Sequence, residues 1–322
     1  MSDHLLLDMA DKLFAEAPDW SAVAELGLPD LLVPEAAGGF GGTWQDAHGV
    51  MRLAGFHALD LPLAETILAG AILQRPTEGR VALADNCAGA VSGTKFSGRL
   101  EAVAGGHQAD HVLTQLNGKI ILLDGKDIAT SEKNILLGEE GATLDFASAP
   151  FEEIAWNGDL LQIGAIMRTA QMAGAFDAAL QLSVGYANDR EQFGRKLGKF
   201  QAVQQELAVF ALEAAAANCA SIAAFRAVAQ GDYGFEAANA KLRCNMAAAK
   251  ATRIAHQVHG AIGFTKEYDL QQFTRRIWGW RSSFGSEAHW ADYLGDLLTQ
   301  VGGDTLWSYM VERDQAASTP AH

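Results

Sequence analysis

The chain has 322 residues, of which 49% are hydrophobic and 20% are charged, and its formal net charge is −15. This length is enough for one large domain or for two or three smaller ones with buried cores. The negative charge argues against nucleic acid and anionic membranes as partners. We also expect no apolar run of the roughly 18 residues that a membrane helix needs.

The amino terminus and the cysteines indicate in which cellular compartment the protein is found. Residues 1–13 lack the basic region and the cleavage pattern of a secretion signal. Three cysteines, Cys87, Cys219 and Cys244, show no metal-ligand spacing. We therefore expect buried thiols, a cytoplasmic protein and no metal site.

Residues 1–75 have the pattern of helices joined by loops. Thr43, followed three residues later by Asp46, is typical of a helix start, because a hydroxyl there can accept hydrogen bonds from free backbone N–H groups. The preceding stretch 31–42 contains Pro34 and four glycines, which cannot propagate a helix. This region predicts a helical domain that contains a glycine-rich loop.

Residues 76–155 change character. Within 111–128, two apolar runs are separated by Asn117-Gly118, and the second run ends at Asp124-Gly125. These dipeptides are typical of tight turns between strands. The region predicts a small middle β domain.

Residues 156–322 are helical again, and two apolar stripes run through them. Steps of three and four residues place each stripe on one face of a helix. The first stripe contains Val203, Leu207, Phe210, Ala214, Ala217, Ser221, Ala224 and Val228, and the second contains Ala240, Cys244, Ala247, Ala251, Ile254 and Val258. Their small side chains predict close packing in an antiparallel bundle. The fold class is therefore mostly α, with domains 1–75, 76–155 and 156–322.

The segment 186–204, YANDREQFGRKLGKFQAVQ, stands out between two apolar helices. It contains four basic and two acidic residues in a chain that is strongly acidic overall. A negatively charged ligand would explain this local excess of positive charge. Taken alone, the charges could equally be solvated groups at a helix end.

Four motifs occur in a specific order. They are GLPDLLVPEAAGGFGGT (27–43), REQFG (190–194) at a helix end, FQAVQ (200–204) at a helix start, and QVHGAIGFT (257–265) at the end of a third helix. Order, spacing and helical context together resemble the acyl-CoA dehydrogenases. The resemblance covers most of the chain. It implies an amino-terminal helical domain, a middle β domain and a carboxy-terminal four-helix bundle, assembled as tetramers with FAD at subunit interfaces.

The resemblance also assigns cofactor-binding residues. It implies that Arg190 reaches the pyrophosphate of a flavin held by the neighbouring subunit, with Gln192 and Phe193 beside it. Gln257 and Gly260 would approach the adenine end. The chemistry is suitable, because a guanidinium matches phosphate oxygens and glycine lets backbone N–H groups come close to a ligand.

The catalytic base of the family is not found at its usual place. The family removes two hydrogens from the Cα–Cβ bond of an acyl-CoA, and a glutamate takes the α-proton. The corresponding position here is Phe284. A second base location, on the first bundle helix, falls in 160–174, which contains Arg168 but no carboxylate. Glu287 is the nearest alternative, although a solvated carboxylate at a helix start is the favoured interpretation of it.

Two further departures concern the flavin. Residues 81–98 lack the Thr-Glu-Pro and Gly-Ser-Asp segments that hold the isoalloxazine ring in the family, and Ala261 replaces a second glycine. The chain thus resembles the short subunit of α2β2 acyl-CoA dehydrogenases, several of which act on steroid side chains.

From these features we expect the chain to complete the FAD site of a longer dehydrogenase subunit that supplies the glutamate. The substrate would be an acyl-CoA, and the electrons would pass to an electron-transferring flavoprotein. Two alternatives remain: a self-sufficient homo-oligomer with a displaced base, and a non-enzymatic scaffold of the same fold.

Overall fold

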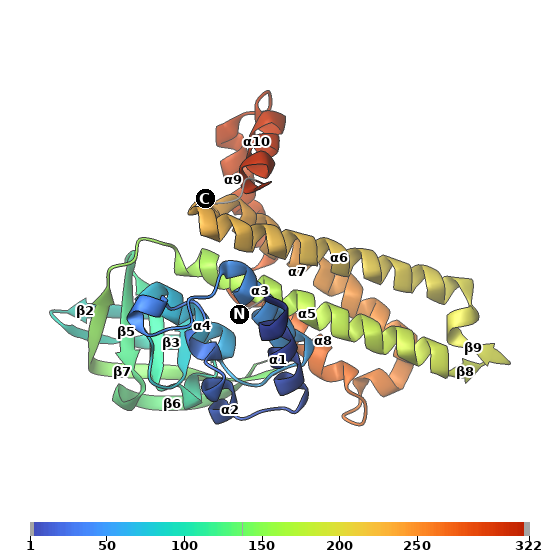
Figure 1. Ribbon diagram of the computed structural model, residues 1–322, viewed down its shortest axis with the longest axis horizontal. Helices are drawn as coiled ribbons and strands as arrows, with labels where there is room; N and C mark the ends of the chain where they lie inside the picture. The colour runs from blue at the N-terminus through green and yellow to red at the C-terminus, as the bar shows by residue number, and fades with distance from the viewer. Residues whose placement is uncertain (1–2, 137, 319–322) are drawn as a thin grey trace.

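The computed structural model describes residues 3–136 and 138–318 (Figure 1). The first region contains four α-helices and two short 3-10 turns. They are α1 (Asp3–Ala15), α2 (Trp20–Glu25), η1 (Leu28–Asp30), η2 (Glu35–Ala37), α3 (Trp44–Phe56) and α4 (Leu63–Leu73). The predicted helix start is confirmed, because the Asp46 N–H donates to Thr43 Oγ1 at 3.2 Å and the Thr43 N–H donates to the Asp46 carboxylate at 2.8 Å. This reciprocal pair is a capping box.

The middle region is a seven-stranded sheet. Its strands are β1 (Val81–Ala84), β2 (Cys87–Ser92), β3 (Lys95–Ala104), β4 (His111–Leu116), β5 (Lys119–Asp124), β6 (Ile128–Leu136) and β7 (Glu139–Ile154), with short turns η3 (Gly106–Gln108) and η4 (Gly125–Asp127). The order is β1-β4-β5-β7-β3-β2, with β6 also paired to β7. The predicted hairpin at Asn117-Gly118 is confirmed, because both residues have a positive φ and Leu116 pairs with Lys119.

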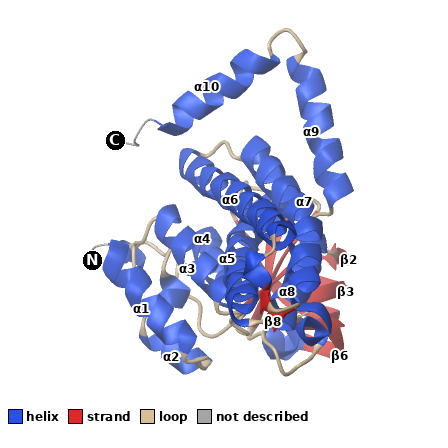
Figure 2. Cartoon of the chain, turned by 90° about the vertical axis from the view of Figure 1, so that its right-hand side faces the viewer, coloured by secondary structure: helices blue, strands red, loops and turns tan. Residues whose placement is uncertain are grey.

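The carboxy-terminal region contains the long helices. They are α5 (Leu160–Asp189), α6 (Gln201–Gln230), α7 (Gly234–His259) and α8 (Leu270–Ser282), followed by α9 (Glu287–Val301) and α10 (Leu306–Ser318). Every residue of the predicted stripe on α7 is buried, as are the central five of the α6 stripe. These stripes therefore form the bundle core, and the mostly α fold with a middle sheet is as predicted. Figure 2 shows α9 and α10 projecting from the bundle.

Helix α5 joins the amino-terminal helices to the bundle. A Cβ on Gly55 of α3 would lie 2.0 Å from the Gln171 backbone oxygen, and one on Gly174 would lie 1.9 Å from that of Arg52. Neither position has room for a side chain, so the backbones of α3 and α5 touch where they cross. An ion pair between Arg52 and Asp177 reinforces the crossing.

Helix α6 corrects two expectations. By length and composition alone it could cross a membrane, so the prediction that no apolar stretch is long enough was wrong. In the structure α6 packs against α5 and α7, and 33% of its most apolar window is buried. Cys219 on this helix is exposed, contrary to the prediction of three buried thiols, and Cys87 is half-buried. The two results on α6 arise because its outer face is apolar yet is not covered by the part of the chain described.

Candidate functional site

The connection between α5 and α6 is a tight hairpin. Strand β8 (Glu191–Gln192) pairs with β9 (Arg195–Lys196). The two residues between them, Phe193 and Gly194, have φ values of 54° and 78°, as a hairpin turn of this kind requires. A short turn, η5 (Leu197–Lys199), then leads into α6. Figure 1 shows the hairpin at the end of the bundle away from the sheet.

Four predicted cofactor-binding residues share one cavity beside this hairpin. Arg190, Gln192, Gln257 and Gly260 line a cavity of about 700 Å³ between the end of α5, the start of α6 and the end of α7. The Arg190 side chain is exposed, and it has no ion-pair partner among the residues described. The cavity therefore presents an unpaired guanidinium, two amides and a glycine backbone, which suit a phosphate ester.

Phe193, the fifth predicted residue, lies apart from this cavity. Its side chain is 89% exposed at the hairpin tip and contacts Phe200 edge to face, with ring centroids 6.2 Å apart.

The end of α7 is fixed to the end of α5 by aromatic stacking. Buried His259 stacks on Tyr186 at 4.6 Å, and its Nδ1–H donates to the Ala255 carbonyl at 2.8 Å. Burial lowers the pKa of His259, so the ring is neutral near pH 7. Gly260 follows with a φ of 65°, in the region that favours glycine. These contacts hold Gln257 and Gly260 opposite Arg190.

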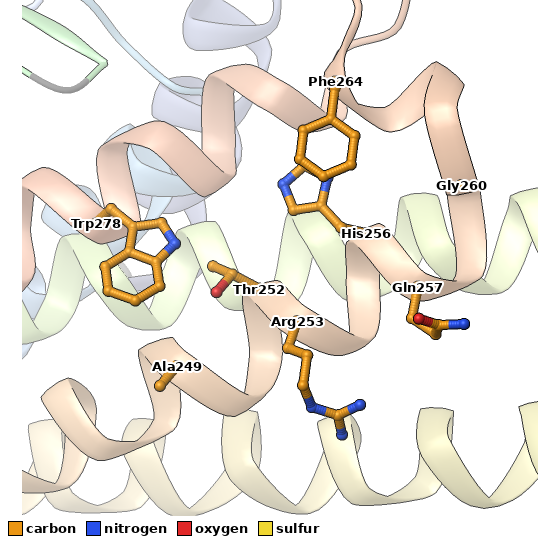
Figure 3. A pocket seen from close by; sticks show the side chains of 8 residues that line it. All are labelled: Ala249, Thr252, Arg253, His256, Gln257, Gly260, Phe264 and Trp278. Atoms are coloured by element: carbon orange, nitrogen blue, oxygen red, sulfur yellow. The ribbon is translucent and has the colours of Figure 1, made fainter.

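A second cavity, of about 510 Å³, adjoins the first along α7. It is lined by Ala249, Thr252, Arg253, His256, Gln257, Gly260, Phe264 and Trp278 (Figure 3). Gly260 and Phe264 belong to the turn η6 (Gly260–Phe264), and the Phe264 ring stacks on His256 at 4.0 Å. Arg253 and Gln257 project from one side of α7 and line both cavities. A ligand could thus extend along α7 past the Gln257 amide.

The turn at Phe284 has a different character. The Phe284 side chain is 2% exposed, and a Cβ added to Gly164 of α5 would lie 2.2 Å from its ring. Phe284 has a φ of 52°, which is unfavourable for a bulky residue. Two hydrogen bonds hold this conformation: its N–H donates to Asp85 at 2.7 Å, and its carbonyl accepts from Trp290 Nε1 at 3.0 Å. The space beside α5 is filled by an aromatic ring.

Lys241 stabilises the same turn through hydrogen bonds to backbone carbonyls. It is fully buried on α7, and its Nζ donates to the carbonyls of Trp280, Arg281 and Gly285 at 2.9, 3.2 and 3.1 Å. It also donates to Asn245 Oδ1 at 2.9 Å. Two of these carbonyls belong to the last turn of α8, whose final C=O groups have no partner within the helix, and the third lies just beyond it.

Arg168 and two glutamates form a buried charge cluster beside Phe284. Arg168 Nη2 lies 2.9 Å from Glu65 Oε1 of α4, and its Nη1 lies 3.7 Å from Glu139 of β7. Trp280 Nε1 donates to Glu139 at 2.6 Å. The cluster joins an amino-terminal helix, the sheet and the bundle. Burial raises the pKa of Glu65, and the Arg168 charge opposes that rise.

Sequence reasoning missed this cluster. The signal was a single glutamate, Glu65, within the apolar stretch 61–73, because a lone buried carboxylate needs a cationic partner. Glu287, the alternative base, instead pairs with Arg281 in the first turn of α9. Within residues 3–136 and 138–318, no group of three His, Cys, Asp or Glu side chains is arranged to hold a metal ion.

The chain is similar to several known proteins. Residues 155–291 match the family described as acyl-CoA dehydrogenase, C-terminal domain. The chain is 32% identical over 316 residues to acyl-CoA dehydrogenase FadE34 of Mycobacterium tuberculosis, covering 88% of this chain and 42% of FadE34. It is 29% identical over 265 residues to acyl-CoA dehydrogenase IpdE2 of the same organism, covering 81% of this chain and 80% of IpdE2. The chain therefore spans less than half of FadE34 and about four fifths of IpdE2.

Two solved structures have a similar fold. One is a variant of the Tcur3481-Tcur3483 steroid ACAD, with a TM-score of 0.82 at 22% identity, covering 92% of this chain and 98% of that chain. The other is the ChsE4-ChsE5 complex from Mycobacterium tuberculosis, also at 0.82, with 20% identity and coverage of 94% and 98%. Residues 155–291 therefore form an acyl-CoA dehydrogenase C-terminal domain, and over most of its length the chain is similar in sequence and fold to acyl-CoA dehydrogenases.

Proposed function

We propose that this chain is the non-catalytic subunit of an FAD-dependent acyl-CoA dehydrogenase, and that its Arg190 cavity completes the flavin site of a longer partner chain. That partner would supply the glutamate that takes the α-proton. The observation that carries the proposal is the unpaired Arg190 guanidinium in an open cavity that it shares with Gln192, Gln257 and Gly260. We also propose the domain boundaries 1–75, 76–155 and 156–322 for this subunit.

The residues of this cavity fit the diphosphate end of FAD. Arg190 would bind the phosphate oxygens through its planar set of donors, and the amides of Gln192 and Gln257 would donate to neighbouring oxygens. The left-handed backbone at Gly260 leaves open space where a side chain would begin. When bound, FAD supplies the acceptor for the β-hydrogen of the acyl-CoA. The role of this chain is to orient the cofactor and neutralise its charge.

The turn at Phe284 does not fit a catalytic base. Its phenyl ring cannot accept a proton, and it fills the space beside Gly164. The nearby carboxylates are already engaged, because Asp85 accepts from the Phe284 N–H and Glu139 accepts from the Trp280 indole. This supports assigning proton abstraction to the other polypeptide.

The exposed apolar face of α6 is consistent with an interface to a partner chain next to the cavity. Val209 is 41% exposed and Leu212 is 70% exposed, and α6 begins at the rim of the cavity with Ala202 and Val203. An apolar helix face of this kind is typical of a subunit interface. We therefore infer a hetero-tetramer in which the partner covers α6 and brings its flavin to Arg190.

The substrate would be a CoA thioester, and the similarity to the Tcur3481-Tcur3483 steroid ACAD favours a steroid side chain over a simple fatty acyl group. An electron-transferring flavoprotein in the cytoplasm would reoxidise the flavin. These assignments follow from the family and the relatives, since the substrate would lie mainly in the partner chain.

Co-expression of this chain with a longer acyl-CoA dehydrogenase subunit tests the proposal. We expect a yellow complex that dehydrogenates acyl-CoA, whereas the chain alone is colourless or poorly soluble. Arg190→Ala and Gln257→Ala should each reduce the FAD that is retained. Full FAD loading and turnover by the isolated chain would instead support the self-sufficient dehydrogenase, and a colourless, inactive complex would support a scaffold.

A further inference from the structure

We propose that Arg253 is a second phosphate-binding cation of this site and that Glu206 holds it in place until the dinucleotide arrives. This inference rests on the proposed function and adds a residue to it. None of the motifs that identified the site includes Arg253 or Glu206. The two side chains face each other across the start of α6 and the end of α7.

Arg253 is positioned to contact the same ligand as Arg190 and Gln257. It lies four residues before Gln257 on α7, so the two side chains share one helix face. Figure 3 shows both projecting from the same side of the helix. Arg253 lines the cavity of about 700 Å³ that also contains Arg190, and it lines the adjoining cavity of about 510 Å³. A dinucleotide extended along α7 would therefore meet Arg190, Gln257 and then Arg253.

The ion pair between Arg253 and Glu206 is exposed and therefore weak. Arg253 Nη2 lies 2.7 Å from Glu206 Oε2, and the two side chains are 59% and 39% exposed. Ion pairs as exposed as this one contribute little to stability, so exchanging the partner costs little. A diphosphate carries two negative charges and offers more acceptor oxygens than one carboxylate. Arg253 would therefore leave Glu206 when the diphosphate binds.

The negative charge of Glu206 opposes the binding of an anion in this cavity. The cavity lining includes Arg190 and Arg253 together with the carboxylate of Glu206. Glu206 keeps Arg253 positioned in the absence of ligand, but it repels a bound anion. Removing its charge should thus tighten FAD binding, whereas removing the charge of Arg253 should weaken it.

A neighbouring ion pair provides a matched control. Lys250 lies one turn before Arg253 on the same helix, and its Nζ is 2.7 Å from Glu213 of α6. It is 55% exposed, nearly as much as Arg253. Lys250 is not one of the residues that line either cavity. The Lys250 side chain is thus matched to Arg253 in helix face and exposure but lies outside both cavities, and its partner Glu213 is 11% exposed and also pairs with Arg243.

The test measures FAD release from the co-purified complex with the longer subunit, followed by flavin fluorescence at increasing salt. The variants are Arg253→Gln, Glu206→Gln, Lys250→Gln and Arg190→Gln, and thermal unfolding checks that each one folds. We expect Arg253→Gln to release FAD about five to ten times faster and with a smaller salt dependence. Glu206→Gln should slow the release by roughly two- to threefold. Lys250→Gln should match the unmodified complex.

The outcomes separate this inference from the proposed function. If Arg190→Gln accelerates FAD release while Arg253→Gln behaves like Lys250→Gln, the role of Arg253 is refuted and the proposed function stands. If neither arginine variant changes the release, both proposals fail. A further variant, Arg253→Lys, keeps the positive charge at this position. If Arg253→Gln releases FAD quickly and Arg253→Lys releases it slowly, the positive charge itself is established as the feature that binds FAD.

Discussion

The turn at Phe284 and the cavity at Arg190 differ in the burial and pairing of their basic side chains. At the turn, Lys241 and Arg168 are buried and their donors are satisfied within the chain. At the cavity, Arg190 is exposed and Arg253 is held only by a solvated carboxylate. Polar groups with internal partners stabilise the fold, whereas unpaired ones remain available to a ligand. On this basis we propose that the Arg190 cavity, and not the turn at Phe284, is the part of the chain that binds a ligand.

The largest expected effect is at the buried cluster. Arg168→Met leaves the Glu65 carboxylate buried without its cation, so the free energy of unfolding should fall by about 3–5 kcal/mol. Urea unfolding followed by circular dichroism measures this change. Adding Glu65→Gln to Arg168→Met should recover part of the loss, because the uncompensated charge is then removed. An unchanged stability in Arg168→Met would contradict the structural role of the cluster.

The second effect is a pH dependence at the junction of α3 and α6. His48 is buried and contacts Phe225 of α6 at 5.1 Å, and burial lowers its pKa to about 4. The unfolded chain takes up this proton near pH 6.5, before the folded chain does. The His48 contribution to stability is therefore complete above pH 6.5 and is lost as the pH falls towards 4, by about 3 kcal/mol.

His48→Gln should flatten the stability profile between pH 6.5 and 4, as measured by urea unfolding at a series of pH values. A profile that keeps its slope in this variant would show that another group titrates there. The FAD retained by the complex at pH 7 should not change, since His48 lies away from the Arg190 cavity.

The third effect tests how tightly Phe284 fills its space. Gly164→Ala places a methyl group against the phenyl ring, so the free energy of unfolding should fall by about 1–3 kcal/mol. Gly185→Ala is the control on the same helix, because a Cβ there has no neighbour within 4 Å. It should be neutral or stabilise α5 by up to about 1 kcal/mol. Equal effects of the two substitutions on unfolding would show that the space beside α5 is not filled.

The smallest effect on stability is expected at the open cavity. Arg190→Gln should change the free energy of unfolding by less than about 0.5 kcal/mol, because the side chain is solvated. The same variant should nevertheless lower the FAD content of the complex, measured from flavin absorbance. A large loss of stability would assign Arg190 to the fold and remove the contrast between the two regions.

Much of the fold could be predicted from local patterns. The Thr43 cap, the Asn117-Gly118 hairpin and the two helix stripes depend on residues close in sequence, and each lies where it was predicted. The Glu65–Arg168–Glu139 cluster was not predicted, because its members come from three regions that only the folded chain brings together. Exposure of Cys219 was missed because α6 is apolar on its outer face as well as in its buried stripe, so composition alone does not separate the two faces.

For the candidate site, the motifs identified Arg190, Gln192, Gln257 and Gly260 as a group, and the structure places them around one cavity. The resemblance of the REQFG motif grouped Phe193 with them, yet its side chain is 89% exposed at the tip of the hairpin. Arg253 and Glu206 carry no motif, and their relevance follows only from the packing of α6 against α7.

The central claim is most directly tested by counting FAD in the purified complex with the longer subunit. Flavin absorbance, compared with the amount of each polypeptide, gives the ratio. We predict one FAD for each pair of unlike chains, because this chain completes a site and holds no flavin ring of its own. Two FAD molecules for each pair would contradict it.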